Sequence, residues 1–301
     1  MAAPAHSDEG FHSRLAAHRH AVELRLAELT PGDGPVPALL AEAARYAVLA
    51  PAKRLRSVLT LLAAEQFGGE ASPGALDFGC ALEMVHAASL VLDDLPCMDD
   101  ARLRRGQPAL HRRYGEDVAV LAAISLLNEA YAVTARAPGL SAEQRLLLVE
   151  RLGAVIGFRG LAAGQISDLR DRSPLTSQAA LHDLNHQKTG LLFVAAVEGG
   201  AIAAGAPAGA LGVAQGFGRK LGEAFQILDD LIDVSSNSEA AGKDVGQDGG
   251  KTTVVSLIGP EAARIEMRRR LDGAIAHLDD AGPGPLSRFA EALFGAAPAA
   301  A

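Results

Sequence analysis

Two clusters of aspartates interrupt long apolar stretches of this sequence. The first cluster contains Asp93, Asp94, Asp99 and Asp100, and the second contains Asp229, Asp230 and Asp233. Burying an unpaired carboxylate is costly, so carboxylates in such surroundings are normally neutralised by a basic partner or a metal ion. The two clusters therefore predict the two halves of one metal site.

The spacing of the second cluster suits a divalent cation. Successive residues of a helix rotate by about 100°, so Asp229 and Asp233, four positions apart, share a face and can reach one ion. Mg²⁺ takes oxygen ligands, and it usually bridges one or two carboxylates to the phosphates of a substrate. We therefore expect Mg²⁺ as the cofactor.

The first cluster is less regular. On an unbroken helix Asp93 and Asp100 would share a face, whereas Asp99 would point elsewhere. Pro96 is expected to end or bend the helix, which would swing Asp99 back toward Asp93. The spacing alone does not choose between Asp99 and Asp100 as the further ligand.

Basic residues accompany the acidic clusters. They are Lys53, Arg54, Arg56, Arg104, Arg105, Lys188, Lys243 and Lys251. Arginine binds phosphate oxygens in a planar fork, lysine binds them as a point charge, and helix N-termini add partial positive charge. Together with the aspartates, this set predicts ligands of the size of a diphosphate.

The elements that position these residues are expected to be helices. Apolar residues recur at helical spacing between short connections rich in Gly or Pro. Helices are predicted at 11–29, 37–49, 52–67, 74–95, 115–136, 141–157, 160–171, 177–187, 189–204, 208–234, 251–257, 260–281 and 284–295. No long linker divides the chain, so we predict one all-α domain over residues 1–301, with a frayed tail at 296–301.

Composition argues against several other classes of protein. The net charge of -8 leaves no broad basic surface for nucleic acid. The N-terminus lacks the features of a secretory signal, and no stretch of about 20 residues is free of charge or Gly as a membrane span requires. Cys80 and Cys97 are too few for a disulfide framework. We expect a cytoplasmic protein without stable membrane insertion.

The motifs resemble those of the trans-isoprenyl diphosphate synthases, the head-to-tail polyprenyl synthetases. In chain order they are Asp93-Asp94-Leu95-Pro96-Cys97-Met98-Asp99, Leu103-Arg104-Arg105-Gly106, Gly164-Gln165-Ile166-Ser167-Asp168, Lys188-Thr189-Gly190, Phe225-Gln226, Asp229-Asp230-Leu231-Ile232-Asp233 and Gly242-Lys243-Asp244. The resemblance covers about residues 35 to 257. Pro51-Ala52 and Ser57 depart from the Gly-Gly and Pro that the family usually has, which affects the shape of the loop rather than its charges.

The resemblance implies the isoprenoid synthase fold, in which antiparallel helices surround a deep central cavity, and a homodimer. It implies that Asp93, Asp99 and Asp229 hold several Mg²⁺ ions with support from Asp94, Asp230 and Asp233. The residues that would grip the allylic diphosphate are Arg104, Lys188, Thr189, Gln226 and Lys243. The residues that would grip isopentenyl diphosphate are Lys53, Arg56, His86 and Arg105. The catalytic set is then Asp93, Asp94, Asp99, Arg104, Lys188, Asp229, Asp230 and Lys243.

His86 has two interpretations. A lone histidine on an apolar helix is more often a core residue than a ligand. Its place seven positions before Asp93, on the same helical face, supports the functional interpretation that the resemblance implies.

The segment before Asp93 is expected to measure the product. The growing tail would pass Ser89, Ala88 and Val85, and Ala88 is small where farnesyl-producing relatives carry an aromatic residue. This pattern is similar to that of bacterial geranylgeranyl diphosphate synthases, so we expect a C20 product for carotenoid or other terpenoid biosynthesis. A farnesyl diphosphate synthase (C15) and a non-catalytic regulatory subunit of a heteromeric synthase are the alternatives.

Overall fold

The structure is a computed structural model, and it describes residues 6–32, 34–170, 186–235, 253–278 and 284–295. The first half of the chain forms α1 (His6–Leu29), α2 (Ala38–Val48), α3 (Leu55–Gly68), α4 (Pro73–Asp93), β1 (Leu103–Arg104), β2 (Gln107–Pro108), α5 (Leu110–Tyr114), α6 (Glu116–Ala135) and α7 (Ala142–Ile156). The second half forms α8 (Leu161–Arg170), the π-helix η1 (His186–Gly190), α10 (Leu191–Ala203), α11 (Ala208–Ser235), α13 (Val254–Ile258), α14 (Pro260–Ala276) and α15 (Pro285–Gly295). The all-α prediction is confirmed.

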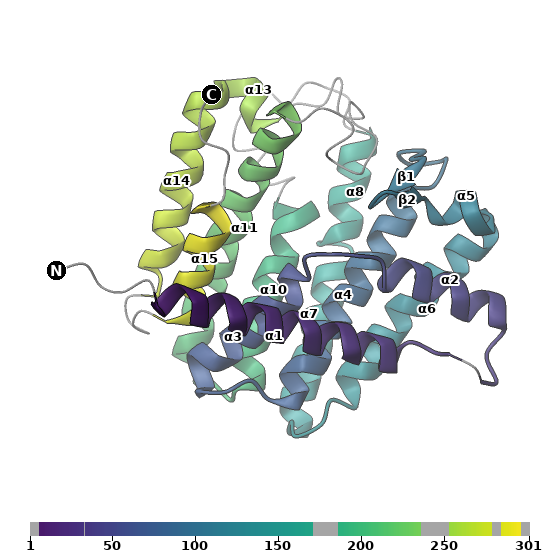
Figure 1. The fold of residues 1–301 in the computed structure, drawn as a ribbon, viewed down its shortest axis with the longest axis horizontal. Coiled ribbons are helices and arrows are strands. Elements are labelled where there is room, and N and C mark those ends of the chain that lie inside the picture. Colours follow the sequence, from purple (N-terminus) through teal and green to yellow (C-terminus); the bar gives the residue numbers. More distant parts are fainter. Residues whose placement is uncertain (1–5, 33, 171–185, 236–252, 279–283, 296–301) are drawn as a thin grey trace.

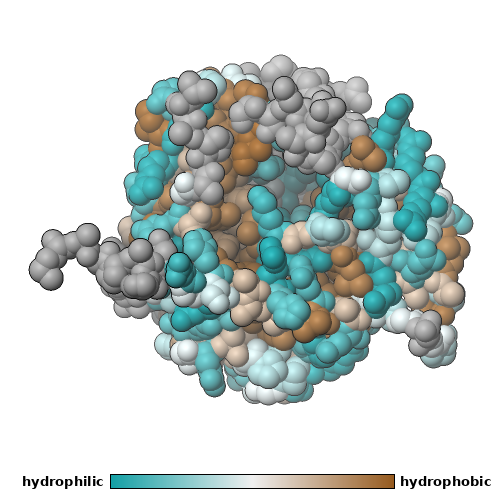
Figure 2. All heavy atoms as spheres, in the orientation of Figure 1, coloured by the Kyte–Doolittle hydropathy of each residue, from teal (hydrophilic) through white to brown (hydrophobic). Residues whose placement is uncertain are grey.

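The long helices stand side by side, and α1 lies across them (Figure 1). Helix α4 packs against α3, α6 and α10, while α10 packs against α3 and α11, and α11 packs against α14. The space-filling view shows that this face of the molecule is hollowed between the upper part of α11 and the hairpin β1–β2 (Figure 2). The carboxyl end of α4 lies beside that hairpin, so the fold brings the first aspartate cluster to the hollowed side.

Helix α4 is the central element of the core. Ser72 caps its first turn by accepting a hydrogen bond from the backbone N–H of Ala75, and Pro73 occupies a position where its missing N–H costs nothing. Apolar side chains on several sides of the helix, including Phe78, Leu82 and Met84, are fully buried. This burial explains why the sequence of α4 is apolar nearly all round rather than along one stripe.

Close packing of α3 against α10 depends on a small residue. A Cβ atom added at Gly200 of α10 would lie 2.3 Å from the carbonyl oxygen of Thr60 in α3. No side chain fits at that distance, so Gly200 lets the two backbones approach. The position of α3 matters for the site because the basic residues Arg54 and Arg56 stand at its start.

Helices α4 and α6 are long and apolar enough to cross a membrane by length and composition alone. In α4 most of the apolar window is buried inside the fold (72%), as expected for a core helix, whereas in α6 only 39% is buried. Two apolar side chains of α6, Leu121 and Ile124, are exposed in the single chain.

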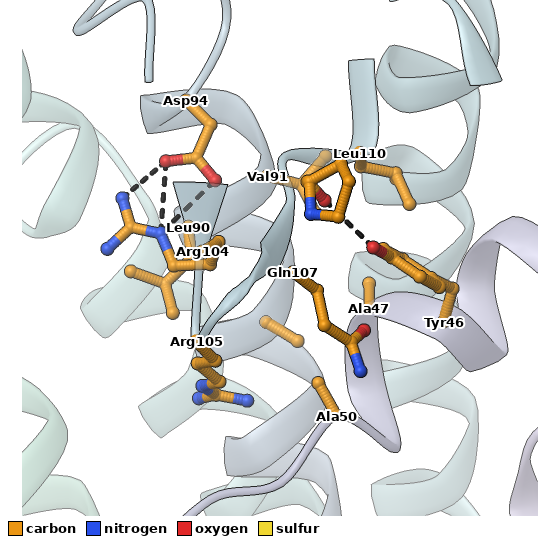
Figure 3. Close-up of a pocket in the computed structure, with 12 residues that line it drawn as sticks. Tyr46, Ala47, Ala50, Leu90, Val91, Asp94, Arg104, Arg105, Gln107 and Leu110 are labelled. Atoms are coloured by element: carbon orange, nitrogen blue, oxygen red, sulfur yellow. Dashed lines mark hydrogen bonds and ion pairs between the residues drawn. The ribbon is translucent and has the colours of Figure 1, made fainter. Parts of the chain in front are cut away.

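The small hairpin β1–β2 was not predicted. Leu103 pairs with Pro108 and Arg104 with Gln107, and the two residues between them, Arg105 and Gly106, both have positive φ (55° and 75°). Two successive residues with positive φ are typical of the tight turn whose twist matches an antiparallel pair. The turn separates Arg104 from Arg105, and the two side chains leave the hairpin in different directions (Figure 3).

Candidate active site

The first aspartate cluster folds back over the end of α4. The helix ends at Asp93, and the backbone N–H of Asp99 donates to the carbonyl of Asp93 at 2.9 Å. Asp100 has a positive φ of 47°, and its carboxylate pairs with Arg112 at 2.6 Å on the exposed side. The backbone of Asp99 thus folds back to the end of α4, as the presence of Pro96 suggested, whereas the side chain of Asp100 turns to Arg112. That Asp99 is the further metal ligand stays a prediction.

Asp93 carries a poorly solvated charge. Burial raises the pKa of its carboxyl from 3.8 to about 6, the nearby charges of Lys188 and Arg104 lower it, and Asp99 and Asp94 raise it further. The two basic side chains therefore offset only part of the cost of burial. Such a carboxylate is suited to binding a cation, because a cation restores the missing stabilisation of the charge.

Asp94 points to a different partner. Its carboxylate accepts hydrogen bonds from Nε of Arg104 at 3.1 and 3.2 Å, and also from Nη2 of the same guanidinium (Figure 3). Asp94 is buried, and burial raises the pKa of its carboxyl while Arg104 lowers it. In this structure Asp94 therefore positions Arg104, whose planar fork suits a phosphate.

A small pocket lies behind Arg104, between the hairpin and helices α2 and α4 (Figure 3). Its wall includes Arg105 and Gln107 of the hairpin and Ala50 after α2. Tyr46 of α2 donates a hydrogen bond to the carbonyl of Pro108 at 2.9 Å, which ties the hairpin to α2. The hairpin is thus held by α4 on one side and by α2 on the other.

The second aspartate cluster lies on α11. Asp230 accepts hydrogen bonds from Nε2 of Gln226 at 3.0 Å and from the backbone N–H of Val254 at 3.2 Å. Burial raises the pKa of Asp230 to about 6. Asp230 therefore links Gln226 to the start of α13. Asp229 and Asp233 of the same cluster are half-buried. The negative charge of Asp229 also opposes the lowering of the Arg56 pKa that burial causes.

The two aspartate clusters offer carboxylate oxygens as ligands. Among the described residues, no three His, Cys, Asp or Glu side chains lie close enough together to hold a metal ion. The donors are carboxylate oxygens, which Mg²⁺ prefers, and a Mg²⁺ ion normally completes its shell with water and substrate phosphates. The residues therefore fit Mg²⁺ bound together with a diphosphate.

Lys188 lies on the π-helix η1. Its Nζ pairs with Oδ2 of Asp168 on α8 at 2.6 Å. The two segments meet at Gly164, where an added Cβ would lie 3.0 Å from the backbone nitrogen of Lys188. Single turns of π-helix are frequent at functional sites. Thr189 is the next residue of the same turn, so η1 carries two of the residues predicted to bind the allylic diphosphate.

A basic cluster surrounds His86 on α4. Burial lowers the pKa of His86 well below its usual 6.5, and the positive charges of Arg56, Arg105, Arg104 and Arg54 lower it further. The positive charges of Arg56 and Arg105 thus act on the imidazole of His86. That these three residues grip isopentenyl diphosphate stays a prediction. Lys53 is exposed in the segment before α3. Lys243 and Lys251 lie outside the described residues.

Sequence reasoning missed one acidic residue of this region. Glu83 lies on α4 one turn before His86, is buried, and pairs with the buried Arg54 at 3.5 Å. The signal was present in the sequence, because a carboxylate inside the apolar α4 requires a partner as much as Asp93 does.

The predicted product-length residues lie on α4 before Asp93. Val85 and Ala88 are fully buried. Ser89 is half-buried, and its hydroxyl donates to the carbonyl of His86 at 3.0 Å.

Comparison with known proteins identifies the family. The model of the family described as Polyprenyl synthetase matches residues 37–282. The chain belongs to the polyprenyl synthetase family. This polyprenyl synthetase is 45% identical over 261 residues to a geranylgeranyl diphosphate synthase of Pantoea ananas, covering 86% of this chain and 85% of the relative. It is 39% identical to the enzyme of the same name from Pseudescherichia vulneris, covering 94% and 92% of the two chains. It is therefore a prenyltransferase.

Solved structures of similar proteins share the fold of this polyprenyl synthetase. An apo FPP/GFPP synthase from Zymomonas mobilis superposes with a TM-score of 0.82 at 30% identity, covering 94% of this chain and 97% of the other. A geranyltransferase from Helicobacter pylori, complexed with magnesium and isoprenyl diphosphate, superposes with a TM-score of 0.81 at 29% identity, covering 98% of each chain. The predicted isoprenoid synthase fold is confirmed.

Proposed function

We propose that this polyprenyl synthetase joins isopentenyl diphosphate to allylic diphosphates and releases geranylgeranyl diphosphate, a C20 product. The observation that carries the proposal is the presence of two groups of basic residues near the end of α4. The charges of Arg104 and Lys188 lower the pKa of Asp93, while those of Arg56 and Arg105 lower the pKa of His86. Two such groups suit the diphosphates of two substrates.

The first group would bind the allylic diphosphate. Arg104, held by Asp94, would present its fork to phosphate oxygens, and Lys188 would exchange its partner Asp168 for the ligand. Mg²⁺, held by Asp93, Asp99 and Asp229, would neutralise the developing charge of the diphosphate as it leaves.

The second group would bind isopentenyl diphosphate. Because its pKa is low, His86 is neutral near pH 7 and can donate one ring N–H, while Arg56 and Arg105 supply the charge. The allylic C1–O bond breaks, the double bond of isopentenyl diphosphate attacks C1, and a new C–C bond forms. The proton lost from the adjacent carbon passes to the released pyrophosphate. The apolar flank of α4 would exclude water that could capture the allylic cation.

Support for the C20 length comes from α4 and from the relatives named above. Ala88 is a small residue in the segment that precedes Asp93, and Val85 lies one turn further away from Asp93. The two bacterial relatives are both named geranylgeranyl diphosphate synthases.

The deciding experiment uses the purified chain alone with Mg²⁺ and isopentenyl diphosphate. Dimethylallyl, geranyl or farnesyl diphosphate serves as the starter, and the dephosphorylated products are separated by chromatography. A main product of C20 is expected. A main product of C15 would identify a farnesyl diphosphate synthase instead. Inactivity alone, with turnover restored by an active partner, would identify a regulatory subunit.

Exposed apolar side chains on α6 and α7 support a homodimer. Leu121 and Ile124 of α6, Leu146 of α7 and Phe158 after α7 are exposed apolar side chains. We propose that a second copy of the chain covers them and that the protein acts in the cytoplasm without inserting into a membrane. Light scattering during size-exclusion chromatography should give twice the chain mass, and Leu121→Glu should shift the protein toward the monomer. A wild-type monomer would contradict the proposal.

A further inference from the structure

A buried ion pair lies beside the basic cluster that surrounds His86. Arg54, directly before α3, and Glu83 of α4 both have side chains that are 2% exposed, and Nη1 of Arg54 lies 3.5 Å from Oε2 of Glu83. We propose that this pair is a positioning device, in which Glu83 holds the guanidinium groups of the cluster where they bind the diphosphate of the homoallylic substrate. The inference rests on the proposed function and assigns residues to it that the sequence motifs did not supply.

The backbone of Arg54 is the first reason. Arg54 adopts a left-handed conformation (φ 52°, ψ 35°), which is unfavourable for a residue with a side chain. Its carbonyl nevertheless accepts a hydrogen bond from the N–H of Val58, the first such bond of α3. Its Nη2 donates to the carbonyl of Ala50 at 3.0 Å. The buried side chain therefore anchors the segment that joins Lys53 to α3 and, through α3, sets the place of Arg56.

The distribution of charge is the second reason. Burial lowers the pKa of Arg56 and of Arg105, the neighbouring arginines lower it further, and the negative charge of Glu83 offsets part of this effect at both residues. Glu83 is thus the carboxylate that stabilises both guanidinium groups that are predicted to bind isopentenyl diphosphate. Three guanidinium groups against the carboxylates of Glu83 and Asp229 keep a net positive charge, which suits an anionic ligand.

The unused hydrogen-bonding groups are the third reason. Nε of Arg54, Nε of Arg56 and Oε1 of Glu83 are buried without a hydrogen-bond partner. A pair that served only to join α3 to α4 would be expected to satisfy its polar atoms, because buried unpaired groups reduce stability. Ser57 already makes a satisfied link between these helices by donating to the carbonyl of Gly79 at 2.9 Å.

A second buried pair on the same helix provides the matched control. Asp77, also on α4 and with a side chain 3% exposed, accepts hydrogen bonds from Arg25 of α1 at 2.7 and 3.1 Å. Neither residue of this pair contributes to the shifted pKa values of His86, Arg56 or Arg105. The Asp77 pair joins two helices without involving the basic cluster.

The test compares Glu83→Gln with Asp77→Asn in the full chain. Steady-state kinetics give KM for each substrate, and thermal denaturation gives the loss of stability. We expect Glu83→Gln to raise KM for isopentenyl diphosphate by about tenfold or more, because it leaves a buried arginine without its counter-charge. KM for the allylic substrate should change by less than about twofold. Asp77→Asn should lower the melting temperature but leave both KM values unchanged.

A conservative variant covers the case in which Glu83→Gln does not fold. Glu83→Asp keeps the charge at a shorter reach, and it should raise only KM for isopentenyl diphosphate, by less than Glu83→Gln does. Equal changes in both KM values, unchanged KM values in both Glu83 variants, or an equal rise in Asp77→Asn would overturn the inference.

A binding measurement separates this inference from the proposed function. If the wild-type chain does not turn over isopentenyl diphosphate, the proposed function is wrong. Calorimetric titration of inorganic pyrophosphate into the wild type, Glu83→Gln and Asp77→Asn then still tests the positioning role. Weaker binding in Glu83→Gln alone supports that role, and equal binding in all three proteins overturns it.

Discussion

Replacing Asp93 by Asn should stabilise the ligand-free protein at neutral pH while abolishing its activity. Asp93 is half-buried, and burial raises the pKa of its carboxyl from 3.8 to about 6 despite Lys188 and Arg104. The ionised carboxylate therefore destabilises the fold in the absence of a bound cation. Asn has nearly the same shape and carries no charge, so it removes the cost of burying the charge.

The size and the pH range of the effect follow from the shift. The rise of the Asp93 pKa from 3.8 to about 6 corresponds to about 3 kcal/mol, and partial exposure of Asp93 makes this an upper value. Because the folded state binds the proton more tightly, the contribution of Asp93 to stability is fully present below pH 3.8 and is lost as the pH rises through about 6. The gain in Asp93→Asn should be largest at pH 8 and smaller at pH 5.

Glu266 on α14 provides a control of opposite sign. Hydrogen bonds from Arg269 and Arg270 lower the pKa of Glu266 from 4.5 to about 2. Its contribution to stability is present above pH 4.5 and is lost as the pH falls through about 2. Glu266→Gln should therefore lower the melting temperature at both pH 5 and pH 8.

Thermal denaturation of the three proteins without metal, and then with Mg²⁺ and inorganic pyrophosphate, checks these expectations. Ligands that bind only the folded state raise its stability, so the additions should stabilise the wild type and Glu266→Gln but not Asp93→Asn. A melting temperature of Asp93→Asn at or below that of the wild type at pH 8 without metal would refute the desolvation argument. Full stabilisation of Asp93→Asn by Mg²⁺ and pyrophosphate would refute its role as a metal ligand.

Three further predictions concern product length, the diphosphate clamp and the approach of α8 to η1. Ala88→Phe should shift the main product from C20 to a shorter chain, seen by chromatography, because Ala88 lies in the segment before Asp93 that is predicted to line the path of the growing tail. Arg104→Lys should lower turnover by at least about tenfold in a kinetic assay, since lysine cannot reproduce the hydrogen bonds by which the guanidinium group of Arg104 is held on the Asp94 carboxylate. Gly164→Ala should raise KM for the allylic substrate, because its Cβ would lie 3.0 Å from the nitrogen of Lys188.

Each of these three predictions can be contradicted by a specific result. An unchanged product from a folded Ala88→Phe protein would exclude this part of α4 from the product cavity. Full turnover by Arg104→Lys would show that a point charge suffices. The control for Gly164→Ala is Gly153→Ala on α7, where the added Cβ would lie 3.8 Å from the Tyr131 hydroxyl oxygen and no substrate effect is expected. Equal changes in KM for the allylic substrate in the two alanine variants would contradict the prediction that the contact of Gly164 with Lys188 matters for substrate binding.

Local patterns in the sequence predicted the helices well. Expected helices at 74–95, 115–136 and 208–234 correspond to α4 (Pro73–Asp93), α6 (Glu116–Ala135) and α11 (Ala208–Ser235). Apolar periodicity, caps and Gly or Pro breaks act over a few residues, so they can be read without knowing the packing. The hairpin β1–β2 was not predicted, because it contains only two residues in each strand and its turn depends on positive φ at Arg105 and Gly106.

The turn after α4 was predicted only in part. Pro96 suggested that the chain would bend back, but the spacing left Asp99 and Asp100 open. The structure separates them through the positive φ of Asp100 and its pairing with Arg112, a residue of α5. Neither a backbone conformation of this kind nor a partner beyond the hairpin can be derived from helical spacing.

The sequence by itself determined which chemical groups are present and which of them share a helix: paired carboxylates on two helices, a set of basic residues in a recognisable order, and a small residue before Asp93. Only the tertiary structure decided how those groups are paired. It turned Asp94 to Arg104, Asp230 to Gln226 and the start of α13, and Glu83 to Arg54. Partner choice among like-charged residues depends on burial and on how separate helices pack. Neither is encoded in local spacing.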